Sequence, residues 1–349
     1  SMGELVTDAK VRATLEALRQ DSVGAGILDP LLEIEGVTDI LVNGPGHVYF
    51  DRGRGLELST VQFSDDQAVR KLAVRLAASV GRRLDEGSPF VDARLPNGVR
   101  VHAILSTLTD CGTCLCLRVP KKLQLTLDDW VANQTMSSQA AVLLRRIVER
   151  KRAFLVTGGT GSGKTTLLGT LLGMVDPSER IVIVEDSREL APNHPHCLRL
   201  ESRTANTEGI GLVTMTDLVR QALRMRPDRV VVGEVRGPEL ADLLTALNTG
   251  HEGGAGTVHA NSAADVPARL EALAGLGGMN RETLHSQLEA ALDVLIHIRR
   301  LNGGRRWVDE IAVIQLHNGL CRAVCAVRFD PVDGLRREFG FAQLERLVC

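Results

Sequence analysis

The chain has 349 residues, of which 44% are hydrophobic and 24% charged, and its 41 Lys and Arg against 43 Asp and Glu leave a net charge of −2. The length predicts about two domains, and charge of both signs spread along the chain argues against a basic nucleic-acid-binding module. No apolar run approaches the roughly 18 residues of a membrane span, and no signal-peptide pattern is present, so we expect a cytoplasmic protein without a membrane span.

The first third of the chain predicts a small α+β domain. Apolar spacing predicts helices over 4–20 and from about 64 to 80. Glycine-rich turns separate the predicted strands 39–42, 47–51, 56–58, 90–95, 99–105 and 115–119. We therefore expect an N-terminal domain over 1–119 with a mixed or antiparallel sheet, followed by a linker over 120–126.

Three arginines of this domain lie on predicted strands, at Arg94, Arg100 and Arg118. Arg94 and Arg100 flank a Leu-Pro-Asn-Gly-Val turn that can present both side chains at one edge. Arginine binds phosphate with two donors and can stabilise charge that develops on it. A single arginine on a strand is more often only a solvated residue.

Seven cysteines in a chain without an export signal argue against a disulfide framework. Cys111, Cys114 and Cys116 are clustered, but a zinc site requires a fourth ligand, and no second Cys-x-x-Cys pair exists. Because the sequence from Cys114 alternates like a strand, buried strand cysteines are the preferred interpretation. Metal binding by the three cysteines is the open alternative.

From residue 127 the pattern changes to strands that alternate with helices. The predicted helices are 127–132, 138–152, 215–224, 239–249, 263–274 and 281–291, and the predicted strands are 153–157, 181–184, 230–232 and 257–258. This alternation predicts an α/β domain over 127–349 with a doubly wound, mostly parallel sheet. The later segments 294–299, 307–316 and 321–327 predict hairpins at an edge of that sheet.

The first strand of this domain runs into a glycine-rich turn with the spacing of a P-loop. The turn comprises Gly158, Gly159, Thr160, Gly161, Ser162, Gly163, Lys164, Thr165 and Thr166. Its glycines allow backbone N–H groups to surround phosphate oxygens, and the following helix adds its positive N-terminus. Lys164 can reach the β- and γ-phosphates, and the Thr165 hydroxyl can hold Mg²⁺. The sequence predicts a nucleoside triphosphate site.

Carboxylates follow the next two predicted strands. Glu185 and Asp186 end the second strand, and Glu234 follows the third. The carboxyl edge of a doubly wound sheet is where ligands bind. Glu185 or Asp186 can hold a Mg²⁺-bound water or polarise the nucleophile, and Glu234 is placed to position or deprotonate water.

Gly233 stands where P-loop proteins commonly have a metal-binding aspartate. We therefore expect Mg²⁺ binding to rest on Thr165 and on waters held by Glu185 or Glu234. Two structural alternatives stay open, a solvated strand end at Glu185 and a pair between Glu234 and Arg236.

Two histidines, His251 and His259, flank a glycine-rich turn and the last predicted strand of the alternating series. A metal site is disfavoured because no third ligand accompanies them. An imidazole near phosphate can instead sense the γ-phosphate or relay its loss to an interface. A purely structural histidine is an equal alternative.

The four motifs together carry a family resemblance. They are Gly-Gly-Thr-Gly-Ser-Gly-Lys-Thr-Thr at 158–166, Glu-Asp-Ser-Arg-Glu-Leu at 185–190, Arg-Pro-Asp-Arg-Val-Val-Val-Gly-Glu-Val-Arg-Gly at 226–237, and Gly-His-Glu-Gly-Gly-Ala-Gly-Thr-Val-His-Ala-Asn-Ser at 250–262. Their order resembles that of the secretion ATPases, the bacterial type II/type IV secretion and pilus-assembly motors. In particular, the chain is similar to the CpaF/TadA branch of tight-adherence pilus ATPases.

The resemblance implies roles for these motifs. It makes 158–166 the Walker A loop, 181–190 the Asp box, and 225–236 an atypical Walker B whose Glu234 is the catalytic glutamate. It makes 250–262 the His box, with His251 and His259.

The resemblance also implies an architecture. A PAS-like N-terminal domain would precede a RecA-like ATPase domain, and a homo-hexamer would hold ATP and Mg²⁺ between the two. Arg100, Arg118 and Arg94 would close over the γ-phosphate.

The leading hypothesis is an ATP-hydrolysing motor for pilus assembly or secretion. It would be cytoplasmic, peripheral at the inner face of the cell membrane through inner-membrane platform proteins, and without direct contact to nucleic acid. One alternative is a RecA-like DNA helicase or translocase, which the neutral charge and the 3% aromatic content disfavour. Another is a nucleotide-gated scaffold without turnover.

Overall fold

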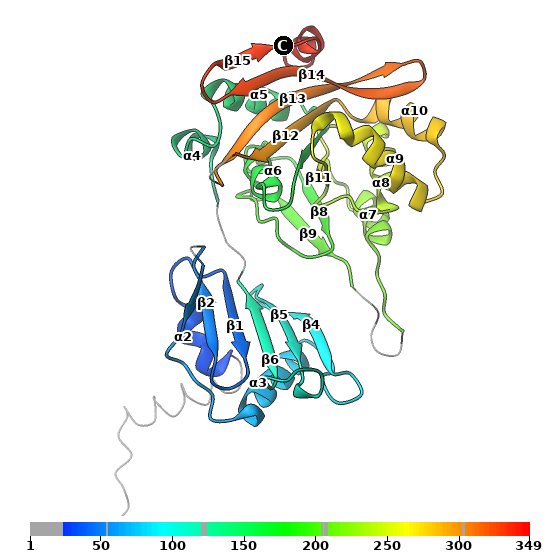
Figure 1. Cartoon of the computed structure of the whole chain (residues 1–349). Coiled ribbons are helices and arrows are strands. Elements are labelled where there is room, and N and C mark those ends of the chain that lie inside the picture. Colours follow the sequence, from blue (N-terminus) through cyan, green and yellow to red (C-terminus); the bar gives the residue numbers. More distant parts are fainter. Residues whose placement is uncertain (1–23, 54, 120–123, 204, 206–208, 302–303) are drawn as a thin grey trace, which may run out of the picture. The chain divides into compact units, whose positions relative to one another are not determined.

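The computed structural model describes residues 24–53, 55–119, 124–203, 205, 209–301 and 304–349. The chain forms two compact units: unit 1 comprises Ser1–Lys122 with Asn206–Glu208, and unit 2 comprises Leu123–Ala205 and Gly209–Cys349. Figure 1 colours the chain along the sequence, from blue in unit 1 to red at the C-terminal end of unit 2. The helix predicted over 4–20 and most of the predicted linker lie outside the described residues. Among the helices that are described, none is long and apolar enough to cross a membrane.

Unit 1 contains an antiparallel sheet of six strands in the order β3-β2-β1-β6-β5-β4. The strands are β1 (Asp39–Asn43), β2 (Val48–Asp51), β3 (Leu56–Leu58), β4 (Phe90–Arg94), β5 (Arg100–Ile104) and β6 (Cys114–Arg118). Alternate side chains of the inner strands are buried. The predicted strands are all present, and of the two predicted sheet types the structure has the antiparallel one.

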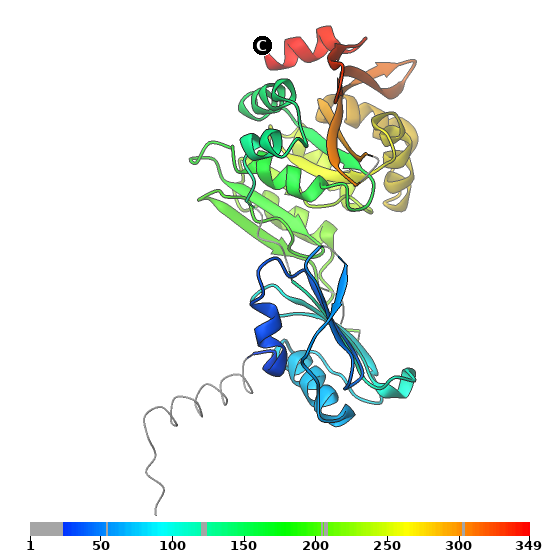
Figure 2. The ribbon, with the colours of Figure 1, turned by 60° about the vertical axis from the view of Figure 1, so that its left-hand side comes forward.

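The buried face of this sheet is covered by α2 (Asp29–Leu32) and α3 (Asp66–Ser79), which share one apolar core with it (Figure 2). The N-cap of α3 is Asp65, whose side chain accepts a hydrogen bond from the Ala68 amide at 2.8 Å. Its buried residues repeat at helical spacing: Val69, Leu72, Ala73 and Leu76. Among the described residues of this unit, no helix covers the opposite face of the sheet.

Unit 2 contains a sheet of nine strands in the order β15-β14-β13-β12-β7-β11-β10-β8-β9. The strands are β7 (Phe154–Gly158), β8 (Ile181–Glu185), β9 (Cys197–Glu201), β10 (Arg229–Val232), β11 (Ala255–His259), β12 (Val294–Arg300), β13 (Arg306–His317), β14 (Leu320–Asp330) and β15 (Gly334–Arg337). From β12 to β9 all neighbours pair in parallel, and β13, β14 and β15 extend the sheet with antiparallel pairs. The mostly parallel α/β sheet predicted from the alternation is confirmed.

Helices cover both faces of this sheet. One face packs on α4 (Leu127–Ala132), α5 (Ser138–Glu149), α6 (Lys164–Leu172) and α11 (Phe341–Val348). The other packs on α7 (Met215–Leu223), α8 (Glu239–Asn248), α9 (Val266–Leu276) and α10 (Arg281–Ala291). Because β7, β8 and β10 are buried on both faces, their sequences are mostly apolar and do not alternate between apolar and polar residues.

A hydrogen-bonded chain inside this core connects α4 to α6. The indole Nε1 of Trp130 donates to the Thr170 hydroxyl at 2.9 Å, and that hydroxyl donates to the Thr166 carbonyl at 3.1 Å. Trp130 is buried, and its polar edge therefore requires such a partner. Thr166 lies in the first turn of α6, so α4 is tied to the start of that helix.

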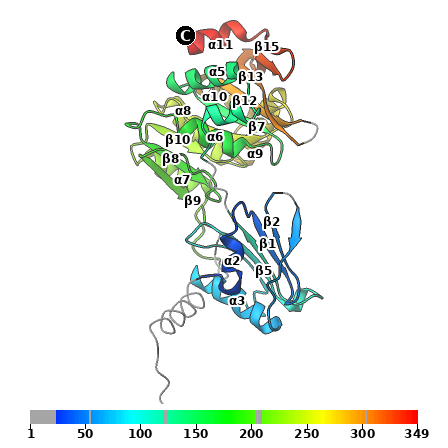
Figure 3. The same ribbon diagram turned by 90° about the vertical axis from the view of Figure 1, so that its left-hand side faces the viewer.

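Three elements of unit 2 were not predicted from the sequence: β9, β15 and α11. β15 adds the outermost antiparallel strand, and α11 packs beside α5 (Figure 3). The predicted hairpin between β13 and β14 is present. It turns at Asn318 and Gly319, whose φ angles of 51° and 77° are those that a two-residue turn with both central residues at positive φ requires.

Candidate functional site

Four parallel strands of unit 2 end at the same edge of the sheet. β7 leads into the glycine-rich loop, β8 ends at Glu185, β10 is followed by Glu234, and β11 ends at His259. Neighbouring parallel strands present their carboxyl ends together. The structure therefore brings the loop, both predicted acidic positions and one of the two histidines to a single edge.

The loop between β7 and α6 has the backbone geometry of a phosphate cradle. Gly161 and Gly163 have φ angles of 67° and 101°, which side-chain-bearing residues rarely adopt. A Cβ on Gly158 would collide with the Ile298 carbonyl oxygen of β12. Lys164 donates to the carbonyl oxygens of Gly158 and Gly159 at 3.1 and 3.0 Å, which folds its side chain over the loop.

Two features of the loop fit a polyphosphate ligand. The Ser162 hydroxyl is buried and has no hydrogen-bond partner among the described residues, a costly arrangement that a ligand oxygen would relieve. Burial lowers the pKa of Lys164, because desolvation penalises the ammonium, while Glu234 opposes that effect. A bound phosphate would offset the same desolvation cost.

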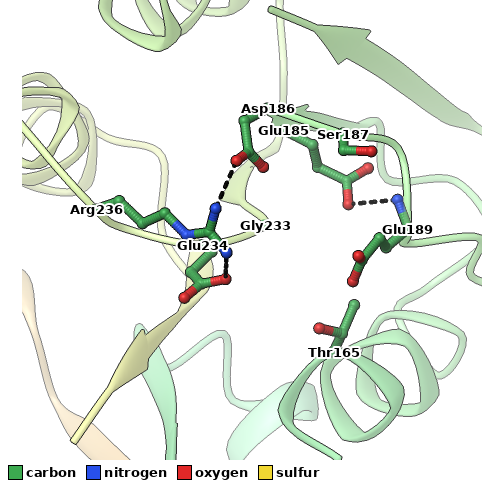
Figure 4. Close-up of a pocket in the computed structure, with 8 residues that line it drawn as sticks. All are labelled: Thr165, Glu185, Asp186, Ser187, Glu189, Gly233, Glu234 and Arg236. Atoms are coloured by element: carbon green, nitrogen blue, oxygen red, sulfur yellow. Dashed lines mark hydrogen bonds and ion pairs between the residues drawn. The ribbon is translucent and has the colours of Figure 1, made fainter. Parts of the chain in front are cut away.

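A pocket beside the loop is lined by Thr165, Glu185, Asp186, Ser187, Glu189, Gly233, Glu234 and Arg236 (Figure 4). Carboxylate and hydroxyl oxygens are the ligands that Mg²⁺ prefers. Among the described residues, no group of three or more His, Cys, Asp or Glu side chains is arranged to hold a metal alone. The pocket therefore fits a Mg²⁺ ion that keeps waters and phosphate oxygens as most of its ligands.

The side chain of Glu185 fills the space next to position 233, which is why that position is a glycine. A Cβ on Gly233 would lie 2.5 Å from Glu185 Cγ, so the glycine makes room for the neighbouring carboxylate. Oε1 of Glu185 accepts hydrogen bonds from the Glu189 and Leu190 amides at 3.0 and 2.9 Å. Its Oε2 is buried and has no hydrogen-bond partner in the part of the chain that the structure describes. The acidic side chain at this position of the pocket thus comes from β8 rather than from β10.

Burial raises the pKa of Glu185 from 4.5 to about 7, although the two amide hydrogen bonds lower it. Between these values the folded chain holds a proton that the unfolded chain has lost, so stability falls as pH rises. We expect Glu185 to lower the free energy of unfolding by about 3 kcal/mol between pH 4.5 and 7.5. Urea titrations of the metal-free protein at several pH values in this range should show that the free energy of unfolding depends less on pH in Glu185→Gln than in the wild type.

Glu149→Gln is the matched control, because Glu149 is an exposed carboxylate on α5, outside the pocket. Equal pH dependence of stability in wild type and Glu185→Gln would contradict the assignment of a proton to Glu185.

Glu234 is held by an arginine in the pocket. Arg236 donates through Nη2 to Glu234 at 2.6 Å and through Nη1 to Asp186 at 2.7 Å (Figure 4). The ion pair considered from the sequence is therefore present, and it extends to Asp186. Arg236 links the ends of β8 and β10 across the pocket.

The structure separates the two histidines. His259 Nε2 lies 3.5 Å from the Thr160 hydroxyl of the loop, and its buried Nδ1 has no hydrogen-bond partner within the described ranges of the chain. His251 precedes β11, at the opposite edge of the sheet, and its Nδ1 lies 3.1 Å from the Ala246 carbonyl near the end of α8. Within one chain His251 is thus not part of the pocket that the sequence placed it in.

The three predicted arginines of unit 1 form one row. Arg94 is in register with Arg100 on β4 and β5, and Arg100 with Arg118 on β5 and β6. They lie on the face of the sheet opposite its helices, since Val101 and Leu117 beside them are buried. Arg100 pairs with Asp92 at 2.6 Å. The row concentrates positive charge at one end of three strands.

The cysteine prediction requires a correction. All the cysteines are free, and Cys111 is exposed, while Cys114 and Cys116 are half-buried on or beside the solvent-facing side of β6. The Sγ atoms of Cys111 and Cys114 are 3.4 Å apart. Buried strand cysteines were therefore too simple an interpretation, because the strand turns these side chains away from the core.

The model of the Type II/IV secretion system protein family matches residues 21–321. The chain belongs to this family. This secretion-system family member is 54% identical over 326 residues to the putative conjugal transfer protein MT3759 of Mycobacterium tuberculosis (strain CDC 1551 / Oshkosh). The aligned region covers 92% of this chain and 93% of that protein. It is 33% identical over 318 residues to the type IV secretion system protein PtlH of Bordetella pertussis, covering 81% and 92% of the two chains.

Solved structures share the mixed α/β fold of this family member. The pilus retraction motor PilT with bound ADP aligns with a TM-score of 0.61 at 22% identity, over 84% of each chain. The ATPase DotB of Legionella pneumophila aligns with a TM-score of 0.58 at 20% identity, over 82% of this chain and 79% of that one. At these identities the likeness concerns the fold.

Sequence reasoning missed two features of the site. The fit of Glu185 against Gly233 could not be read from spacing, because the two residues lie on strands that are neighbours only in the folded sheet. The second is Arg306, whose side chain packs against Gly163 of the loop. The signal for Arg306 in the sequence was the presence of four arginines within residues 299–306.

Proposed function

We propose that this protein is an ATPase motor of a type IV secretion or pilus-assembly machine, of the CpaF/TadA branch. The observation that carries the proposal is the convergence of the P-loop, Glu185, Glu234 and His259 at one sheet edge. A phosphate cradle beside an acid that can direct water is what phosphoanhydride hydrolysis requires. Membership of the secretion-system family supports the cellular role.

In this proposal the loop amides from Gly158 to Thr166 and the Lys164 ammonium bind the β- and γ-phosphates of ATP and stabilise charge on the transferred phosphoryl group. Lys164 would exchange its two loop carbonyls for phosphate oxygens. Thr165, with waters held by Glu185 or Glu234, would hold Mg²⁺. When bound, that ion neutralises charge on the phosphate oxygens.

Glu234 directs the attacking water in this proposal. Its carboxylate is partly exposed in the pocket, where Arg236 orients it. His259, beside Thr160, would respond to the presence of the γ-phosphate. His251, at the other sheet edge, would act only toward a neighbouring subunit.

The proposed cycle uses both units. We assign unit 1 as PAS-like and unit 2 as RecA-like, joined near 120–126, with Arg94, Arg100 and Arg118 closing on the γ-phosphate in a homo-hexamer. ATP binding would draw the units together and product release would let them separate. The motion would be passed to inner-membrane platform proteins, with the motor peripheral at the inner face of the cell membrane.

The proposal is tested by measuring phosphate release against protein concentration, with the particle mass determined in the same buffer. We expect specific activity to rise with assembly into a ring, because arginines from another subunit would complete each site. Full activity in a monomer would overturn the assembly part of the proposal. Absence of turnover in an assembled ring would favour the nucleotide-gated scaffold.

A further inference from the structure

The hairpin formed by β12 and β13 carries four arginines next to the P-loop. They are Arg299, Arg300, Arg305 and Arg306. Arg299 pairs with Asp309 at 2.6 Å, and the guanidinium of Arg305 lies 5.8 Å from the ring centre of Trp307. Two of the four arginines therefore have partners that explain their presence.

The other two arginines of the hairpin face each other across its two strands. Arg300 and Arg306 are cross-strand partners in the antiparallel register. Within the described part of the chain, neither side chain forms an ion pair with a carboxylate. Like charges placed directly opposite each other destabilise a sheet. The hairpin therefore carries an electrostatic cost that its own residues do not offset.

Arg306 reaches the phosphate cradle itself. A Cβ on Gly163 would lie 3.1 Å from Arg306 Cδ, 3.6 Å from its Nε, and 3.5 Å from Ile298 Cδ1. Gly163 is the N-cap of α6 and directly precedes Lys164. The arginine stem is thus packed on the residue where the loop enters the helix, on the β12 side of the loop, whereas Glu234 approaches from β10.

We infer that Arg306 is a phosphate-binding residue of the nucleotide site, which contacts the polyphosphate from the β12–β13 hairpin, and that Arg300 adds to the positive potential there. The inference rests on the proposed function, because the ligand is the nucleotide of that site. A guanidinium beside an N-terminal helix turn offers charge-assisted donors to phosphate oxygens. The anion would also relieve the repulsion between the two arginines.

The test is the affinity of the assembled full-length protein for a fluorescent ADP analogue, with ADP and GDP as competitors. We expect Arg306→Ala to weaken binding by about tenfold, the effect of one lost charge-assisted hydrogen bond. The loss should be equal for ADP and GDP, because the phosphates rather than the base are contacted. Arg306→Lys should recover part of it.

Arg305→Ala is the matched control, since it removes an arginine from the same hairpin that stacks on Trp307 instead of facing Gly163. An equal loss in Arg305→Ala would overturn the inference, because the hairpin fold would then explain it. Wild-type affinity in Arg306→Ala, with weakened binding in Lys164→Ala, would overturn the inference alone. Wild-type affinity in Lys164→Ala would instead count against the proposed function.

Discussion

Replacing Lys164 by alanine is expected to reduce ATP hydrolysis at least a hundredfold, the scale on which single donors to a developing oxyanion act. Among the described residues, the ammonium donates hydrogen bonds to the loop carbonyls of Gly158 and Gly159 alone, and it is partly desolvated. Its removal therefore costs the fold little, because the lost hydrogen bonds are offset by the relieved desolvation. Phosphate release and thermal unfolding, measured on the same preparation, separate the two effects.

Lys151→Ala is the appropriate control. Lys151 belongs to the same unit, follows α5, and pairs with Glu179 at 3.5 Å, away from the loop. It should retain full activity. A Lys164→Ala variant with unchanged turnover would remove the P-loop from the mechanism.

Glu234→Gln is expected to slow hydrolysis at least a hundredfold while nucleotide affinity is retained. The amide keeps the size of the side chain but can neither accept a proton from water nor attract it as a carboxylate does. The pair with Arg236 is partly exposed, and such pairs contribute at most about 1 kcal/mol to stability. A catalytic role therefore predicts a large loss of turnover with a small change in unfolding temperature.

The structural alternative for Glu234 makes the opposite prediction. If Glu234 served only to hold Arg236, Arg236→Ala and Glu234→Gln would lower stability to the same extent and turnover would follow stability. Glu149→Gln, which changes an exposed glutamate on α5, is the control for the substitution itself. Wild-type turnover in Glu234→Gln would refute the catalytic role.

The parts of this protein that the sequence predicted well are those where local pattern and topology coincide. β7, β8 and β10 are mostly apolar, because both of their faces are covered, and the residues that end or follow them carry the chemistry: the glycine-rich loop, Glu185 and Glu234. Parallel pairing then places those ends together without further information. The P-loop and the two acidic positions were therefore predictable.

The elements that were missed depend on their neighbours. β9 alternates at the sheet edge and is only half-buried, and β15 contains Gly334 and two arginines among its four residues. Such strands form because a partner offers unpaired backbone groups, and their own hydrophobicity does not reveal them.

The histidines and the arginine of the hairpin show the same limit at the level of the site. His251 and His259 are close in sequence, but β11 carries them to opposite edges of the sheet. Arg306 is remote from Gly163 in sequence, but β12 pairs with β7 and brings it there. Separation in sequence therefore did not predict which residues are neighbours in space. The order of the strands in the sheet decides this.

The link from Trp130 through Thr170 to Thr166 gives the protein an intrinsic optical reporter. The chain has two tryptophans, and Trp130 is the one whose indole is hydrogen-bonded to the helix that follows the P-loop. Any shift of the first turn of α6 alters the polarity around that indole, so its emission follows events at the loop without an attached dye. In a Trp307→Phe variant, Trp130 would be the single tryptophan, and stopped-flow measurement of its fluorescence would give the rates of structural change at the loop.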